Sequence, residues 1–499
     1  MKDSKLNHRL SGIDAGFFYL ERKEIPLNIA VVALLEGPVP FAQFTASLSA
    51  KLHLIPRYRQ IVVTPPFHAG YPMWGDDPNF DIRNHVKHVH LPAPGARRQL
   101  EELADGLLAE VMDRGRPLWS IHVIDGLEGG RGAIIARVHH ALADGVSGAS
   151  LMKVLFDPTA TPPPLPKPPA WHPQPLPKEE ISLGEALVSG LHGALRNMIA
   201  AEEVILDFGQ GLFTERTQQG LIELGPLLPE LAASGDRFPF NKPCGGERKF
   251  RWTEFPLEGA KAIKNALGGT VNDVILTVYN RALSRYIQLH KEPVTNRFIR
   301  IVCPVNVRQN DNGESLGNQI SFLPVALPLD IADPAEMLRA VARRTAIMKN
   351  AKASHLIALI TAWLGSTPPP VQALFWWGIP MIPLPMSLLN TICTNVPGCP
   401  TPLYAAGKRL LALYPHVPTG YELGVNCAVH SYDGKLFYGL TADAHVCADV
   451  DKLRDLLEEA FAELSEAAGI KPENPPAPEK AKAPRRRGPR KAAAGMAHA

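Results

Sequence analysis

A proline-rich segment is the feature that most limits how this chain can fold. Residues 157–180 read DPTATPPPLPKPPAWHPQPLPKEE. Proline lacks a backbone N–H and its ring blocks the preceding helical turn, so this density of prolines excludes both a helix and a central strand. The segment is therefore predicted to be an extended, semi-rigid connector. Because the chain has 499 residues, it is long enough to place one core on each side of it.

A second biased segment lies at the C-terminus. Residues 471–499 end in KAKAPRRRGPRKAAAGMAHA, a composition that cannot build an apolar core. This tail is either a solubilising segment, which is favoured, or a contact for anionic lipid or nucleic acid. The expected organisation is an N-terminal domain at 1–157, a linker at 158–180, a C-terminal domain at 181–470 and a disordered tail.

Strand and helix patterns alternate in both halves of the chain. Short branched apolar runs indicate strands, and apolar positions at 3.6-residue spacing indicate helices. Before the linker, strands are expected at 28–36, 120–127 and 132–140, and helices at 41–58 and 99–113. After it, helices are expected at 181–205, at 270–287 with Thr270 or Asn272 as the cap, and at 450–467; strands are expected at 298–308 and 318–329, with a hairpin at 424–443. This alternation predicts an α/β fold.

Charge and cysteine content exclude several classes of protein. The formal net charge of +3 is too small to indicate a nucleic-acid partner. The six cysteines show no CxxC pair, so they are interpreted as thiols in a reducing compartment and not as a zinc site or a disulfide framework. The N-terminal residues contain no apolar stretch of secretory length, and a cytoplasmic protein is expected.

The stretch 353–407 contains no Asp, Glu, Lys or Arg. A membrane-spanning helix needs about 20 continuous apolar residues, and here prolines at 368–370, 380, 383 and 385 interrupt the run. Three interpretations remain open for this stretch. It forms a pair of core helices, the wall of an acyl tunnel, or a surface that dips into a membrane.

Two adjacent histidines lie at the centre of the motif ARVHHALADGVSG at 136–148. His139 and His140 are expected to end a strand, so their side chains leave on opposite faces. Asp144 follows in the loop that opens a helix, and Gly145 allows the tight turn from strand to helix. One histidine can therefore point into a cleft while the other packs behind it.

A histidine is a suitable base for an alcohol nucleophile near neutral pH. Its unperturbed pKa of about 6.5 leaves the ring mostly neutral and able to accept a proton. A metal site is the weaker interpretation, because adjacent strand histidines diverge and no further ligand follows at a fixed spacing. Two structural histidines would be the default interpretation for an isolated pair.

The surrounding motifs resemble those of the bacterial wax ester synthase/acyl-CoA:diacylglycerol acyltransferases, a branch of the coenzyme A-dependent acyltransferase superfamily. HHALADG is similar to the HHxxxDG signature, and LSGIDAGFFYLE is similar to the N-terminal motif of the family. RPLW, NDVILTV, PVNVR, LGNQISFLPVALPL and TNVPG resemble further family motifs. These motifs occur in the family order from about residue 10 to residue 464.

The resemblance implies a fold and a set of roles. It implies two similar domains, each with a mixed sheet flanked by helices, and an active-site channel between them. His140 would be the general base, with His139 and Gly145 shaping its loop. Asp144 would hold the loop through an ion pair, for which Arg308 is the candidate partner.

The same resemblance places other motif residues along the substrate channel. Pro117, Leu118 and Trp119 would flank it, as would Asn272 and Asp273. Asn272 would either supply an oxyanion donor or cap its own helix, the latter being favoured.

The expected function is transfer of a fatty acyl group from acyl-CoA to diacylglycerol or to a long-chain alcohol. Acyl-CoA is a substrate, and no cofactor, metal or nucleic acid is expected. A protein peripherally associated with a membrane or lipid droplet is expected, because acceptor and product are apolar. The alternatives are an acyltransferase for another alcohol and a catalytically silent lipid-surface protein of the same fold.

Overall fold

The computed structural model describes residues 9–65, 70–142, 151–164, 169–174, 215–227, 235–306, 320–351, 367–382 and 389–470. Several expectations fall outside these residues. They concern Asp144, Gly145, Arg308, the helix at 181–205 and the tail at 471–499.

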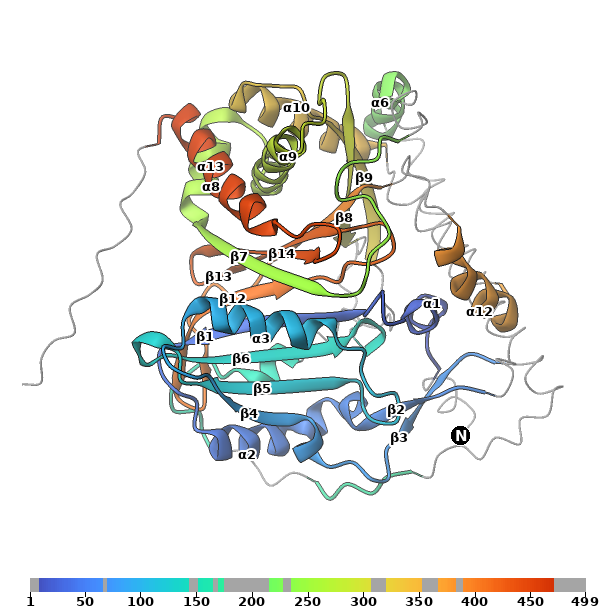
Figure 1. Ribbon diagram of the computed structural model, residues 1–499, viewed down its shortest axis with the longest axis vertical. Helices are drawn as coiled ribbons and strands as arrows, with labels where there is room; N and C mark the ends of the chain where they lie inside the picture. Colours follow the sequence, from blue (N-terminus) through green and yellow to red (C-terminus); the bar gives the residue numbers. More distant parts are fainter. Residues whose placement is uncertain are drawn as a thin grey trace, which may run out of the picture.

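The first of two six-stranded sheets is built mainly from the N-terminal half of the chain (Figure 1). Its strand order is β11-β12-β1-β6-β5-β4, and β5 pairs parallel with β4 but antiparallel with β6. The strands are β1 (Asn28–Leu35), β4 (Val86–His90), β5 (Trp119–Asp125), β6 (Gly132–His139), β11 (Tyr404–Ala405) and β12 (Lys408–His416). The helices of this half are α1 (Gly12–Leu20), α2 (Phe41–Lys51) and α3 (Arg97–Ala109), and a small sheet joins β2 (Gln60–Val63) to β3 (Met73–Asp76).

The second sheet has the order β7-β14-β13-β10-β8-β9, and β10 runs parallel to both of its neighbours. Its strands are β7 (Arg248–Pro256), β8 (Phe298–Asn306), β9 (Ile320–Pro328), β10 (Thr391–Val396), β13 (Val425–Tyr432) and β14 (Lys435–Asp443). The helices of this half are α6 (Glu215–Leu224), α8 (Leu257–Leu267), α9 (Val271–Leu289), α10 (Pro334–Asn350), α12 (Pro369–Gly378) and α13 (Val450–Ala467). In Figure 1, α8, α9, α10 and α13 lie together on the side of this sheet away from the first sheet. The expected α/β class with two similar mixed sheets is confirmed.

Strand β12 ties the two halves together. It comes from the C-terminal part of the chain, yet it pairs antiparallel with β1 in the first sheet. It also packs against β13 and β14 of the second sheet. A Cβ atom on Gly439 would lie 1.8 Å from the carbonyl oxygen of Pro415, so only glycine allows this approach.

The ends of several elements differ from the sequence-based expectation. The strand expected at 132–140 ends at His139, and a 3-10 helix, η7 (His140–Leu142), begins at the next residue. The helix expected at 41–58 ends at Lys51, because the chain tightens into the 3-10 helices η2 (Leu52–Leu54) and η3 (Pro56–Arg59) near its proline. Further 3-10 helices in the described residues are η5 (Ile82–Asn84), η6 (Glu128–Gly130), η8 (Gly225–Leu227) and η9 (Ile379–Met381).

Candidate active site

The main chain around the two histidines is held from both sides. The N–H of His139 donates to the carbonyl oxygen of Leu118 at 2.9 Å. The N–H of His140 donates to the carbonyl oxygen of Leu27 at 2.8 Å. Leu118 belongs to the RPLW motif at the start of β5, and Leu27 immediately precedes β1. Both neighbouring strands of β6 therefore fix the position at which the histidine pair leaves the sheet.

His139 is fully buried, and its ring is oriented by two contacts. Its Nδ1 accepts the N–H of Ala141 at 3.0 Å, so the proton of the neutral ring lies on Nε2. Nε2 faces Oε1 of Glu21 at 3.4 Å, a polar contact that falls outside good hydrogen-bond geometry. The edge of the Phe18 ring packs on the same imidazole at a centroid distance of 6.2 Å. These contacts occupy the whole ring, so His139 is a packed partner and not a group open to substrate.

Glu21 is a buried carboxylate with three partners. Oε1 accepts the N–H of Leu27 at 3.2 Å in addition to facing His139, and Oε2 lies 3.4 Å from Nη2 of Arg114. Burial alone would raise the pKa of this carboxyl. The contacts with His139, Leu27 and Arg114 outweigh burial, and the pKa of Glu21 is lowered. An ionised Glu21 therefore links the ring of His139 to the segment that holds the main chain of His140.

His140 is partly exposed and stacks on Phe17 of α1, with ring centroids 3.9 Å apart and an interplanar angle of 28°. Its Nδ1 is enclosed by protein atoms. Burial lowers the pKa of His140 to about 4, His139 adds to the effect, and the main-chain carbonyl of His140 itself opposes it. The ring is therefore neutral near pH 7 and able to accept a proton, although it is a weaker base than free imidazole.

The expected flanking residue Trp119 is fixed at the start of β5. Its Nε1 donates to the carbonyl oxygen of Tyr58 at 2.7 Å, and its indole stacks on His85 at 4.4 Å. Pro117 and Leu118 are also buried. The RPLW residues thus lie directly beside His139 through the main chain of Leu118, and their expected place along a substrate channel stays a prediction.

The expectation that Asn272 caps its own helix is wrong. Thr270 is the cap of α9, because its Oγ1 accepts the N–H of Asp273 while Oδ2 of Asp273 accepts the N–H of Thr270 at 2.8 Å. Oδ1 of Asp273 also accepts the hydroxyl of Thr345 at 2.7 Å. Asp273 is therefore engaged in building the start of α9.

Asn272 instead meets a residue of the TNVPG motif. The side-chain Nδ2–H of Asn395 on β10 donates a hydrogen bond to Oδ1 of Asn272, with the two atoms 3.3 Å apart. The structure thus joins two motifs that lie 123 residues apart in the sequence. Within the described residues, no hydrogen bond connects this pair to His139 or His140, so the oxyanion role expected for Asn272 stays a prediction.

Phe17, Glu21 and Arg114 were not predicted as site residues, although all three contact the histidine region. The motif LSGIDAGFFYLE contains both Phe17 and Glu21, and this was the available signal. Arg114 carried none, since it reaches Glu21 from the segment after α3 across 93 residues of sequence. The proposed pair of Asp144 and Arg308 lies outside the described residues.

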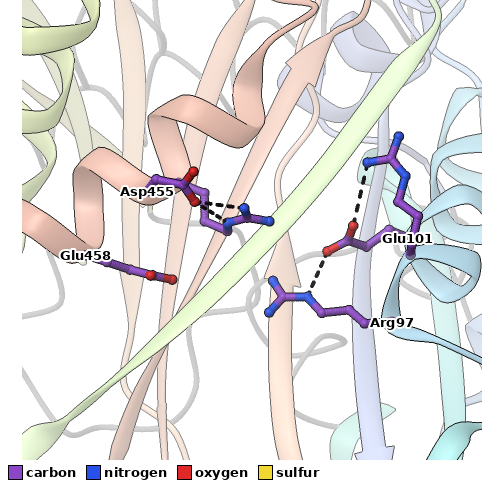
Figure 2. Close-up of a pocket in the computed structure, with 6 residues that line it drawn as sticks. Arg97, Glu101, Asp455 and Glu458 are labelled. Atoms are coloured by element: carbon purple, nitrogen blue, oxygen red, sulfur yellow. Dashed lines mark hydrogen bonds and ion pairs between the residues drawn. The ribbon is translucent and has the colours of Figure 1, made fainter.

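A pocket of about 380 Å³ lies where α3 meets α13, on other elements than the histidines (Figure 2). Charged residues line it, namely Arg97, Arg98, Glu101, Arg454, Asp455 and Glu458. Each arginine is paired, for example Arg97 with Glu101 at 2.8 Å and Arg454 with Asp455 at 2.8 Å. Such a lining is unsuited to an acyl chain. In the described part of the chain, no group of three or more His, Cys, Asp or Glu side chains is arranged to hold a metal ion.

Comparisons with known proteins cover almost the whole chain. The wax ester synthase/diacylglycerol acyltransferase catalytic domain matches residues 10–275, and the WS/DGAT C-terminal domain matches residues 316–465. A probable diacylglycerol O-acyltransferase of Mycobacterium tuberculosis is 30% identical over 477 residues, which span 92% of this chain and 96% of the relative.

Solved structures share the fold. A wax ester synthase/diacylglycerol acyltransferase from Marinobacter aquaeolei is 23% identical with a TM-score of 0.65, over 93% of this chain and 100% of that one. The first condensation domain of the calcium-dependent antibiotic synthetase is 15% identical with a TM-score of 0.58, over 92% and 96% of the two chains.

Two mixed sheets with a histidine pair at the end of β6, together with the matched catalytic domain, define the protein as an acyltransferase. Within that class, the chain belongs to the wax ester synthase/diacylglycerol acyltransferase family.

Proposed function

We propose that the protein transfers a fatty acyl group from acyl-CoA to diacylglycerol, to a long-chain alcohol, or to both, with His140 as general base. The observation that carries this proposal is a neutral, partly exposed imidazole at the end of β6, stacked on Phe17 and tied by its main chain to Leu27. The name of the Mycobacterium tuberculosis relative supports diacylglycerol as one acceptor.

The proposed reaction needs no covalent enzyme intermediate, since a thioester is already activated. The alcohol oxygen attacks the thioester carbon while His140 takes the hydroxyl proton. The C–S bond then breaks, and the proton passes from the imidazolium to the departing thiolate to give free coenzyme A. Because Nδ1 of His140 is enclosed, Nε2 is the nitrogen that would meet the hydroxyl. Holding the ring ready in this way lowers the cost of bringing base and nucleophile together.

Turnover assays test the proposal and the choice of acceptor together. Purified protein is mixed with palmitoyl-CoA and either dioleoylglycerol or hexadecanol, and release of free thiol and formation of ester are measured. Ester formation with either acceptor is expected, and the ratio of the two rates assigns the acceptor class. Absence of ester with both lipids, but product with a polar alcohol, would identify an acyltransferase of another kind. Absence of any product would favour a silent protein of the same fold.

We further propose that the enzyme works on the cytoplasmic surface of a membrane or lipid droplet. None of the described helices combines the length and apolar character required to cross a bilayer. The support for peripheral association is the apolar nature of the proposed acceptor and product, together with the absence of charged residues from 353 to 407. Recovery of the protein with the lipid fraction after flotation of a cell lysate would test this location.

A further inference from the structure

Helix α12 and the following η9 carry a group of exposed apolar side chains, called here the α12 surface. Its members are Val371, Leu374, Phe375, Trp377, Met381 and Ile382. They are six of the twelve large apolar residues that are exposed in the described part of the chain. No charged residue occurs from 367 to 382. Single exposed apolar residues are ordinary on a soluble protein, whereas a continuous group marks a contact surface.

The opposite side of α12 packs on α1, and the two helices lie side by side at the edge of the molecule (Figure 1). Nε2 of Gln372 donates to the carbonyl oxygen of Gly12 at 3.1 Å. The indole of Trp376 lies directly on Gly16, where a Cβ atom would come within 2.6 Å of the ring. Beyond α1, Nη2 of Arg22 donates to the carbonyl oxygen of Trp377 at 3.0 Å.

Helix α1 in turn contacts the histidine site. Phe17 follows Gly16 in the sequence and stacks on His140 at 3.9 Å. The α12 surface is therefore separated from the candidate base by a single helix. Trp376 contacts Gly16 of that helix, and the next residue, Phe17, stacks on His140.

We propose that the α12 surface docks on an anionic lipid surface, and that docking activates His140 through α1. This inference rests on the proposed acyltransferase function and adds that lipid binding regulates its rate. Lipid contact would fix α12 against α1 through Trp376 and Gly16, and α1 would then hold Phe17 against His140.

The chemistry of the surface favours lipid as the occupant. Trp377 and Phe375 are 55% and 43% exposed, and aromatic side chains of this kind are favoured at the headgroup boundary. Arg22 contacts the carbonyl oxygen of Trp377 at the end of α12, and the exposed Lys23 follows it in the sequence. The acidic residues of α1 and the segment after it include Asp14, which accepts the hydroxyl of Ser11, and Glu24. Basic side chains in this position attract anionic headgroups.

Flotation with vesicles tests the docking surface. The vesicles contain phosphatidylcholine and phosphatidylglycerol in equal parts, at low salt. Wild type should float, and Leu374→Ser/Trp377→Ser should stay with the unbound protein. The matched control is Leu54→Ser/Leu289→Ser, which removes two exposed apolar side chains elsewhere and should float like wild type. Failure of wild type to float, or flotation of the Leu374/Trp377 variant, would overturn the proposal. A wild-type dimer that this variant abolishes, without vesicle binding, would make a second copy the occupant and would overturn it too.

Rates with water-soluble substrates test the coupling to His140. Hexanoyl-CoA and a short-chain alcohol are used, and the rate with acceptor-free vesicles is divided by the rate without them for each variant. Wild type and the matched control should give a ratio of at least about five, the lower end of typical coupling. Leu374→Ser/Trp377→Ser should give a ratio near one. Gly16→Ala, which pushes Trp376 away from α1, should still float but lose the increase. A wild-type ratio near one, or an unchanged ratio in Gly16→Ala, would contradict the coupling.

Failure of the proposed function gives a different result. In that case no condition releases thiol, and hydrogen exchange of α1 decides the inference instead. Slower exchange of the amides in Gly12–Leu20 on addition of vesicles, in wild type but not in Gly16→Ala, would support the link from α12 to α1. Unchanged exchange in wild type would overturn it.

Discussion

Glu21 shows how a buried residue can influence the position of the proposed base, His140, without touching it. Its carboxylate faces Nε2 of His139 and accepts the N–H of Leu27, whose carbonyl oxygen in turn holds the N–H of His140. One charge therefore orients the first histidine and fixes the segment that places the second. Glu21 is accordingly a positioning residue.

We expect Glu21→Gln to lower kcat about tenfold while the KM for acyl-CoA stays unchanged, because loss of an orienting partner misplaces a histidine without removing it. Steady-state kinetics would show this split. Glu110→Gln is a suitable control, since it removes a carboxylate that pairs with Arg137 at 2.7 Å and has 58% of its side chain exposed. A rise in KM with kcat unchanged would indicate that Glu21 serves substrate binding instead.

The lowered pKa of His140 predicts the pH profile of the free enzyme. A base works when it is deprotonated, so kcat/KM should fall only as the pH approaches the pKa of about 4. We expect little change in kcat/KM between about pH 7 and pH 5.5, with circular dichroism to confirm folding at each pH. A fall centred near pH 6.5, the ordinary pKa of imidazole, would show that the ring is more exposed to water than the structure indicates.

Individual strands and helices can be predicted from the sequence better than the residues at which they end and the elements with which they pair. The apolar run at 28–36 and the helix at 270–287 correspond to β1 and α9. The change at His140 from strand to 3-10 helix was not predicted, because the apolar run through residue 138 continues into the histidines without a turn residue. The pairing of β12 with β1 depends on contacts across more than 370 residues, which no local pattern contains.

Candidate site residues follow the same rule. His139 and His140 could be predicted because the motif places them side by side in the sequence. The hydrogen bond between Asn272 and Asn395 could not be predicted, because it forms only when the start of α9 is brought to β10 in the folded protein. The three interpretations of 353–407 could not be separated for a similar reason. Its helix α12 has one face against α1 and the other in solvent, and this division depends on tertiary packing.

The junction between α3, β7 and α13 depends on one buried arginine. The fully buried side chain of Arg251 contacts Asp105 at 3.0 Å, Asp451 at 3.0 Å and Glu101 at 3.6 Å. Arg251→Met should cost about 3–5 kcal/mol in the free energy of unfolding, because it removes the cation that pairs with the largely buried carboxylate of Asp105 and is shared by Glu101 and Asp451. Arg98→Met in the same cluster should cost less than about 1 kcal/mol, since that side chain is 52% exposed. Urea unfolding would measure both, and similar small losses would contradict a central role for Arg251.

For the whole molecule, buried neutral histidines predict sensitivity to acid. Burial lowers the pKa of His122 to about 4 and that of His416 to about 3, alongside His140. Between these values and the unfolded pKa of about 6.5, the unfolded chain binds more protons than the native protein. The free energy of unfolding should therefore decrease as the pH falls below about 6.5, and continue to decrease toward the native pKa values.

Urea unfolding at about pH 7 and about pH 5 would measure this loss of stability. This pH interval lies above the ordinary titration range of carboxyl groups, so their protonation contributes little to it. His416→Phe should lose less stability between the two pH values than wild type. Equal losses would mean that His416 does not contribute to the acid sensitivity of the native state.

We propose that His140 accepts the proton in acyl transfer and that His139 keeps the segment around His140 in place. The most direct measurement compares His140→Gln and His139→Gln for ester formation from palmitoyl-CoA and dioleoylglycerol or hexadecanol, together with their melting temperatures. We expect His140→Gln to melt like wild type and to lose about 10² to 10⁴ in kcat, the usual contribution of a general base. His139→Gln, which breaks the contact with Glu21, should lose part of its activity and also melt at a lower temperature. Near-normal turnover by a folded His140→Gln variant would contradict the account.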